Sequence, residues 1–190
     1  MGRSNVGKSS LINALVRRRI ARASAAPGKT RLANVYQVTA GGGEPFYLVD
    51  LPGYGYARGG GAAARGFDEL TAEFFGRVRQ VGPVRQVGGV NSPARPPPPA
   101  PLAHVSALLI VDSRHPGLRS DIRAWQWLQS SVERVAIVAT KIDKLARGER
   151  IRALRQHESV FDRPVQPVSA VSGEGLEDLW KLIAQRLTSG

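Results

Sequence analysis

The chain contains no cysteine, and this absence excludes disulfides, thiolate metal sites and thiol nucleophiles. Long apolar runs are also lacking, since none approaches the roughly 18 to 20 residues that cross a membrane. The start of the chain has no apolar core of a secretory signal. We therefore expect a soluble, cytoplasmic protein, with an organellar location left open should a targeting segment precede Met1.

Acidic residues are missing from the start of the chain, where none occurs before Glu44. Over the whole chain 27 basic residues face 15 acidic ones, a net charge of +12. The cations before Glu44 are Arg3, Lys8, Arg17, Arg18, Arg19, Arg22, Lys29 and Arg31. They exceed what one triphosphate requires and indicate a surface for a polyanion, most naturally RNA. An arginine-rich composition throughout stays open as the alternative, because arginine is also scattered later in the chain.

The length of 190 residues, with 42% hydrophobic residues, suits one domain with a real core and is too short for two ordinary ones. The clearest break in composition is Gly82–Pro101, which ends in ARPPPPAP. Proline repeats cannot join a helix or a sheet interior. We therefore expect a single domain over residues 1–190 with a surface insertion at 82–101.

The stretch Gly2–Ser9 reads GRSNVGKS and fits the phosphate-binding loop pattern G-x-x-x-x-G-K-[ST], directly before an apolar-periodic helix. Its glycines let the backbone close around a phosphate chain, and the first helical N–H groups donate to it. Lys8 would reach the β- and γ-phosphates, and the Ser9 hydroxyl would bind Mg²⁺. The expected nucleotide contacts here are Gly2, Arg3, Ser4, Asn5, Val6, Gly7, Lys8 and Ser9.

Such a loop normally leaves the end of a buried strand, yet Met1 is the only residue before Gly2. In a doubly wound sheet that strand is central, so its absence would leave two neighbours with unpaired backbone groups, at roughly 1 to 3 kcal/mol each. We expect the natural protein to carry an apolar strand of about five or six residues before Met1. The proline-rich insertion is a weaker candidate to fill the gap, since proline has no donor.

Further along the chain, an apolar strand ends in the aspartate of a D-x-x-G motif, Asp50–Gly53. Asn34–Thr39 and Phe46–Asp50 predict two strands with a glycine turn between them. Asp50 would face the water shell of magnesium, and the Gly53 amide would point at a γ-phosphate. One Asp-x-x-Gly alone is a plain turn, but in this order it predicts nucleotide contacts by Asp50, Leu51, Pro52 and Gly53.

Strands and helices alternate along the rest of the chain. Helices are expected at Phe67–Val78, Leu118–Leu128, around Ile151 and Leu154, and at Leu176–Leu187, and strands at Val105–Asp112, Val135–Thr140 and Val165–Val168. This alternation predicts an α/β fold, a doubly wound and mostly parallel sheet flanked by helices. Tyr54–Gly66 is glycine-rich and expected to be mobile, Trp127 to be a partly buried surface aromatic, and His115 a loop residue.

The stretch Thr140–Asp143, TKID, points to a guanine base. Asp143 at the mouth of a strand can accept two hydrogen bonds from guanine groups that adenine lacks, and the Lys141 stem can pack over the ring. Ser169 and Ala170, after the last strand, would set a backbone N–H at guanine O6. The expected base contacts are Thr140, Lys141, Ile142, Asp143, Val168, Ser169 and Ala170. A non-hydrolysing basic RNA-binding module and an ATP-using P-loop enzyme stay open as rivals.

These segments together resemble the translation-factor-related P-loop GTPases and, within them, the EngB (YihA/YsxC) family of ribosome-assembly GTPases. The matching stretches are GRSNVGKSSLINAL, the PGKT loop, VDLPGYGYA, DSRHP and TKIDK. The resemblance covers nearly the whole chain apart from residues 59–65 and 82–101. It implies a monomeric switch that binds GTP, GDP and Mg²⁺ and acts on the large ribosomal subunit or its precursor through ribosomal RNA. It also implies a link to normal cell division and septation.

The resemblance implies individual roles as well. Thr30 of PGKT would bind magnesium and sense the γ-phosphate, so Ser9, Thr30 and Asp50 form the expected metal set. Further nucleotide contacts would come from Gly28, Lys29, Thr30, Arg31 and Leu32. Asn5 occupies the position that coordinates K⁺ in some relatives.

Slow hydrolysis is expected, because Tyr54 stands where many GTPases carry a water-orienting glutamine. The expected catalytic set is Lys8, Thr30, Gly53 and Asn5.

Overall fold

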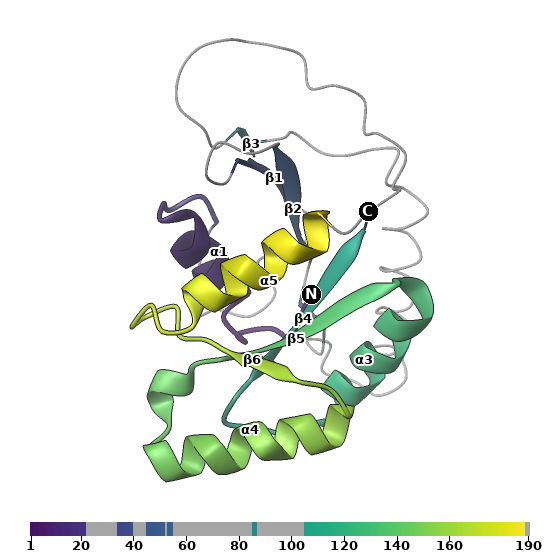
Figure 1. Ribbon diagram of the computed structural model, residues 1–190, viewed down its shortest axis with the longest axis vertical. Helices are drawn as coiled ribbons and strands as arrows, with labels where there is room; N and C mark the ends of the chain where they lie inside the picture. The colour runs from purple at the N-terminus through teal and green to yellow at the C-terminus, as the bar shows by residue number, and fades with distance from the viewer. Residues whose placement is uncertain (22–33, 40–44, 52, 55–84, 87–104, 189–190) are drawn as a thin grey trace.

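The computed structural model of the protein describes residues 1–21, 34–39, 45–51, 53–54, 85–86 and 105–188 (Figure 1). In chain order these residues form α1 (Lys8–Val16), β1 (Asn34–Val38), β2 (Phe46–Asp50), β3 (Arg85–Gln86), β4 (Ser106–Asp112), α3 (Arg119–Ser131), β5 (Arg134–Thr140), a 3₁₀ turn η1 (Ile142–Lys144), α4 (Arg147–Phe161), β6 (Val165–Pro167) and α5 (Leu176–Thr188). The predicted alternation of strands and helices, and with it the α/β fold, is confirmed. No helix in this part of the chain is long and apolar enough to cross a membrane.

The strands form two three-stranded sheets. One is parallel, in the order β4-β5-β6, with Leu109 opposite Ile137 and Ile137 opposite Val165. The other has the order β2-β1-β3, in which β1 and β2 are antiparallel and β3 runs parallel to β1. The two residues of β3 come from the expected insertion at 82–101, and because neither is a proline, their N–H groups remain available for the ladder.

The two sheets meet at the first residues of the chain. The Met1 nitrogen donates to the Leu108 carbonyl at 2.8 Å, and the Ile110 N–H donates to the Met1 carbonyl at 2.7 Å. On the other side Arg3 forms a parallel bridge with Tyr54. Among the described residues, Met1–Arg3 lie between β4 and the end of β2, the place in the sheet where the first strand is expected.

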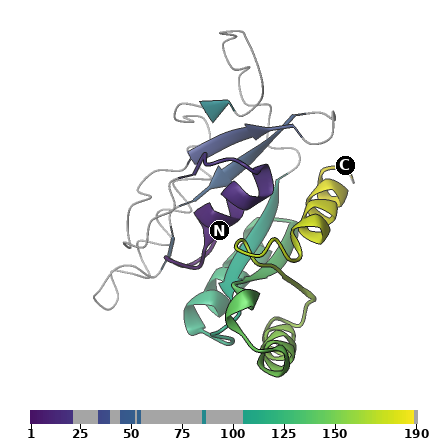
Figure 2. The same cartoon turned by 90° about the vertical axis from the view of Figure 1, so that its left-hand side faces the viewer.

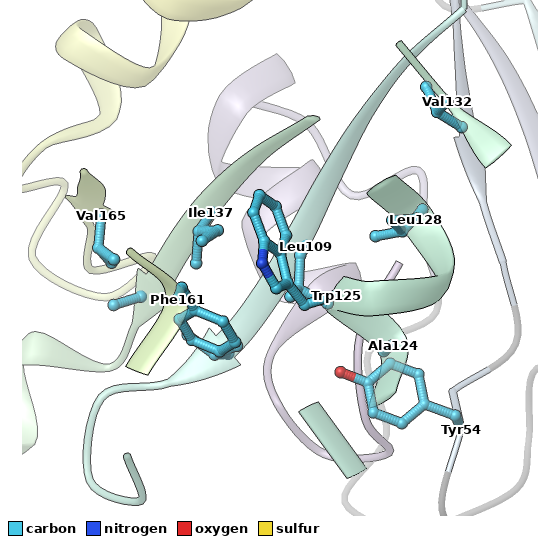
Figure 3. Packing of buried hydrophobic residues seen from close by; sticks show 11 residues of the cluster. Tyr54, Leu109, Ala124, Trp125, Leu128, Val132, Ile137, Phe161 and Val165 are labelled. Carbon is cyan, nitrogen blue, oxygen red and sulfur yellow. The ribbon is translucent and has the colours of Figure 1, made fainter. Parts of the chain in front are cut away.

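Side chains of the parallel sheet alternate between two layers of core. Leu109 and Val111 of β4 pack in a cluster with Trp125, Leu128 and Phe161, which come from α3 and α4 (Figure 3). Trp125 and Phe161 meet edge to face, with ring centroids 5.9 Å apart. Because successive residues of a strand point to opposite faces, this sheet is buried on both sides, which explains its continuous apolar runs.

The opposite face is covered by α1 and α5. Ile110 of β4 packs there with Leu11, Leu15, Leu179 and Ile183. Figures 1 and 2 show α1 and α5 on one side of this sheet and α3 and α4 on the other. The Trp180 indole N–H donates to the Leu15 carbonyl at 3.1 Å and so fixes the end of α1 against α5.

Two surface expectations and the helix predicted around Ile151 and Leu154 are confirmed. Trp127 is half-buried against the core, and His115 is an exposed loop residue. Both residues lie on α4, where Leu154 packs on the core and Ile151 is 45% exposed. The predicted helix Phe67–Val78 lies outside the described residues.

Candidate nucleotide-binding site

The phosphate-binding loop leads into α1, and no side chain caps the N-terminal end of this helix. Gly7 is the N-cap residue, with φ of 98°, and makes no side-chain cap; Asn5 also has a positive φ of 61°. The first turn of α1 contains no acidic residue. The first N–H groups of a helix lack intrahelical partners and bind anions well. Because left-handed backbone costs a side-chain-bearing residue energy, glycine suits position 7.

Lys8 bends back over this loop. Its Nζ donates to the carbonyls of Gly2 and Arg3, both at 3.0 Å. An ammonium has three donors, and among the described residues these two carbonyls are its partners. Burial lowers the pKa of Lys8, and the charge of Asp50 only partly opposes this. An anion at the loop would supply the missing compensation.

Ser9 and Asp50 form the part of the predicted metal set that the structure describes. The Ser9 hydroxyl donates to Asp50 Oδ2 at 3.4 Å, and Asp50 is 4% exposed. Asp50 Oδ1 is buried without a hydrogen-bond partner among the described residues, and burial raises the pKa of this carboxyl against the opposing charge of Lys8. Hydroxyl and carboxylate oxygens are ligands that Mg²⁺ takes, so these residues fit the ion.

The DLPG segment approaches the phosphate loop closely. A Cβ added at Gly53 would lie 2.7 Å from the Ser4 nitrogen and 2.9 Å from its Cα. The Ser4 N–H donates to the Tyr54 carbonyl at 3.2 Å. Glycine is therefore required at position 53, and the two motifs predicted to surround a γ-phosphate do lie together.

The expected base-binding residues also meet. The Ser169 hydroxyl donates to Asp143 Oδ1 at 2.7 Å, and Ser169 Oγ accepts the N–H groups of Val171 and Ser172 at 3.2 and 3.0 Å. The Ser169 bond, together with Lys144 at 3.3 Å, lowers the pKa of Asp143. Asp143 is thus held as a carboxylate, the form that accepts hydrogen bonds from guanine.

Two side chains from the end of β5 join the base loop to the phosphate loop. The Thr140 hydroxyl lies 2.6 Å from the Val6 carbonyl oxygen, and Lys141 Nζ donates to the Asn5 carbonyl at 2.5 Å. Lys141 also donates to Asp112 Oδ2 at 2.9 Å. Both expected halves of the site therefore form one hydrogen-bonded unit.

Sequence reasoning missed Asp112. This residue ends β4, has a side chain that is 3% exposed, and accepts two hydrogen bonds from the Arg114 guanidinium at 2.9 and 2.7 Å. Burial opposes its ionisation, but the bonds from Arg114 and Lys141 outweigh burial and hold the pKa of Asp112 well below its usual range. The signal was available, because Asp112 is an acid at the end of a buried strand, as Asp50 is.

Tyr54 corrects one expectation. It was predicted to open a mobile segment, but it is 7% exposed and lies beside Ala124 in the core (Figure 3). Its hydroxyl donates to Asp121 Oδ1 at 3.1 Å, and Arg3 Nε lies 3.9 Å from the same oxygen. Burial and the neighbouring Asp121 raise the pKa of Tyr54. The aromatic ring anchors the residue after DLPG because it finds both an apolar cluster and a buried acceptor.

The remaining residues of the predicted site fall into three groups: those with buried side chains, those with half-buried side chains, and those outside the described residues. Val6, Ile142 and Val168 have side chains at most 1% exposed, so they offer a ligand only their backbone. Leu51 and Ala170 are half-buried at the site's edge. Gly28, Lys29, Thr30, Arg31, Leu32 and Pro52 lie outside the described residues.

The fold and the site together define a P-loop GTP-binding domain. A family model described as "50S ribosome-binding GTPase" matches residues 1–80. The chain is 36% identical to the probable GTP-binding protein EngB of Thermotoga maritima over 191 residues, which cover 98% of this chain and 84% of that protein. It is also 36% identical to the same-named protein of Lacticaseibacillus casei, over 97% of this chain and 82% of that one. The chain belongs to the EngB family of GTP-binding proteins.

Solved structures show the same fold. A crystal structure of a probable GTP-binding protein engB matches with a TM-score of 0.63 at 20% identity, covering 100% of this chain and 97% of that one. Era, solved in complex with MgGDPNP and nucleotides 1506–1542 of 16S ribosomal RNA, matches with a TM-score of 0.71 at 19% identity, over 100% of this chain and 55% of that one.

Asp112→Asn should lower the free energy of unfolding at pH 7 by about 1.5 to 3 kcal/mol, because hydrogen bonds to a buried charge are lost. Asp112 has a depressed pKa in the folded state, so its stabilisation is present above the unfolded value near 4 and is lost as pH falls below it. The variant should therefore lose less stability than the unmodified protein between about pH 5 and pH 3. Urea unfolding followed by tryptophan fluorescence measures this.

The matched control is Asp162→Asn, which removes an exposed carboxylate at the end of α4. Because this carboxylate is exposed, the substitution should change the stability at pH 7 by much less than Asp112→Asn does. If Asp112→Asn and Asp162→Asn gave the same acid profile, Asp112 would not be the charged anchor of Lys141 and Arg114.

Proposed function

We propose that this protein is a GTP-driven switch with slow GTP hydrolysis that acts in assembly of the large ribosomal subunit. The observation that carries the switch is the contact of Gly53 with the phosphate loop at Ser4. A γ-phosphate, which GTP has and GDP lacks, would meet both segments at once and change how they pack. Selectivity for guanine rests on Asp143, which Ser169 holds ionised.

Magnesium would be held by Ser9 and Asp50, with Thr30 as the third expected ligand. The ion would neutralise charge on the β- and γ-phosphates. Asp50 Oδ1, which is buried and has no hydrogen-bond partner in the part of the chain that the structure describes, supports this assignment. Lys8 would bind the phosphates through its remaining donor, and the backbone of Gly2–Ser9 would enclose them.

Slow hydrolysis is supported by the burial of Tyr54, whose hydroxyl is engaged by Asp121 and does not replace a water-orienting glutamine. The residues that would position the γ-phosphate and water are Lys8, Gly53, Thr30 and Asn5. Asn5 is also the proposed ligand for a K⁺ ion in the role of an arginine finger.

A ribosomal partner is supported by the net charge of +12 and by the description of the matching family model as a 50S ribosome-binding GTPase. Era, a neighbour in fold, is described in complex with 16S ribosomal RNA. We propose that this single-domain protein acts as a cytoplasmic monomer on the large subunit or its precursor, and that its loss disturbs cell division and septation.

Asp143→Asn should weaken GTP binding by 2 kcal/mol or more, about 30-fold, because a charge-assisted bond to guanine is worth about 1.5 to 3 kcal/mol. Titration calorimetry with GTP and with ATP measures this. Asp162→Asn serves again as the control of equal charge change. Equal affinity of the unmodified protein for ATP and GTP would rule out the proposed base site.

Ser9→Ala should remove the magnesium dependence of GTP binding while leaving the circular dichroism spectrum unchanged, because only a half-buried hydroxyl beside Asp50 is lost. The neighbouring Ser10 is exposed, so Ser10→Ala is the matched control and should behave as the unmodified protein. Binding of GTP to the Ser9 variant that still responds to Mg²⁺ as before would contradict the metal assignment.

Co-sedimentation with purified large ribosomal subunits tests the proposed partner. Binding should be stronger with a non-hydrolysable GTP analogue than with GDP, because the γ-phosphate orders the switch. Equal binding with both nucleotides would contradict the switch, and absence of binding with either would contradict the ribosomal role.

A further inference from the structure

The turn that follows α1 carries three consecutive arginines, Arg17, Arg18 and Arg19, all of them exposed. No acid precedes Glu44 in the chain. The ion pairs among the described residues include none of these three arginines. Within the part of the chain that the structure describes, the turn is therefore a surface of one charge sign without a paired acid, which we call the basic turn (residues 17–19).

The backbone of the basic turn is fixed from inside by Asn13. The Asn13 side-chain oxygen accepts the N–H groups of Ile20 and Ala21 at 2.9 and 2.8 Å, and its amide donates to the Ala21 carbonyl at 2.8 Å. Arg17 adopts the left-handed conformation with φ of 52°, and its N–H donates to the Ala14 carbonyl at 3.3 Å. One side chain thus closes the loop around the three arginines.

Both ends of the turn are tied to the core. Ala21 is 6% exposed and packs with Tyr36 and Val38 of β1. Before the turn, the Leu15 carbonyl accepts the Trp180 indole N–H. A pre-ordered backbone lowers the entropy lost on binding, so the three guanidinium groups are presented on a rigid base.

We propose that the basic turn is the surface by which this protein contacts the phosphate backbone of ribosomal RNA, an inference that rests on the proposed ribosomal function. Guanidinium groups bind phosphate oxygens in pairs and retain their charge at any physiological pH. The turn extends from the C-terminal end of α1, whereas the phosphate loop lies at its N-terminal end, so nucleotide and RNA would use opposite ends of one helix.

The other arginine-rich surface, α4, fits this role less well. Arg150 is paired with Glu174, and Glu149 and Glu158 lie on the same helix as Arg147, Arg152 and Arg155. Figures 1 and 2 both show α4 at the lower end of the molecule, away from α1. The helix therefore supplies a control surface with the same residue type and number of charges.

The experiment measures binding to purified large ribosomal subunits, with a non-hydrolysable GTP analogue, between about 50 and 200 mM salt. Two variants of equal charge change are compared: Arg17→Gln, Arg18→Gln, Arg19→Gln and Arg147→Gln, Arg152→Gln, Arg155→Gln. Each RNA phosphate contact contributes about 0.7 to 0.9 to the slope of log affinity against log salt. The first variant should lose about 2 to 3 units of slope, and the second should keep the slope of the unmodified protein.

GTP affinity should be unchanged in both variants, because neither alters the nucleotide site. The triple lysine variant, Arg17→Lys, Arg18→Lys, Arg19→Lys, should keep most of the slope, because the charge remains. Should the triple glutamine variant fold poorly, the three single Arg→Gln changes replace it, each expected to lower the slope by nearly one unit.

Two results would overturn the inference while leaving the ribosomal role intact. In one, the unmodified protein binds and the basic-turn variants keep its affinity and slope. In the other, the α4 variant loses as much slope as the basic-turn variant, which would mean that only net charge matters. If the unmodified protein did not bind subunits at all, both the ribosomal role and the basic turn as its contact would be overturned.

Discussion

The buried contact between the Thr140 hydroxyl and the Val6 carbonyl, at 2.6 Å, is the interaction on which the rest of the site depends. Thr140 ends a strand whose next residues carry the proposed base-recognition loop, and Val6 lies in the phosphate-loop motif, 134 positions away in the chain. Lys141 adds a second link to Asn5, and Asp112 orients Lys141 from the neighbouring strand. Because parallel strands deliver these residues to one edge, base and phosphate contacts share one rigid frame.

That frame holds charges that lack full compensation in the protein alone. Burial lowers the pKa of Lys8 and raises the pKa of Asp50, so each group is less favourably charged than it would be in water. Phosphates would offset the first and magnesium the second. Binding of both should therefore stabilise the fold as well as occupy the site, since a ligand that binds only the native state adds to its stability.

The sequence sufficed for the parts of the site that short motifs encode. Gly7, Lys8 and Ser9 lie in one loop, and Asp50 with Gly53 and Asp143 each follow an apolar strand, so their positions at the sheet edge could be predicted. Contacts between residues far apart in the chain could not be predicted in this way. Tyr54 bonds to Asp121, 67 positions later, and Lys141 to Asp112, 29 positions earlier, and local patterns say nothing of such pairs. Asp112 could be found only by its place at a strand end.

The structure also separates two groups of basic residues that composition alone does not distinguish: those that already have partners in the protein, and those that face solvent. Arg3, Arg114 and Lys141 are paired with acids around the nucleotide site, at Asp121 and Asp112, and Lys8 donates to two carbonyls. These groups already have partners, so they explain little of the surplus charge. Arg17, Arg18 and Arg19 are exposed and enter none of the ion pairs found among the described residues. Positive charge that lies on a rigid turn away from the nucleotide site can attract a polyanion without competing with GTP for that site.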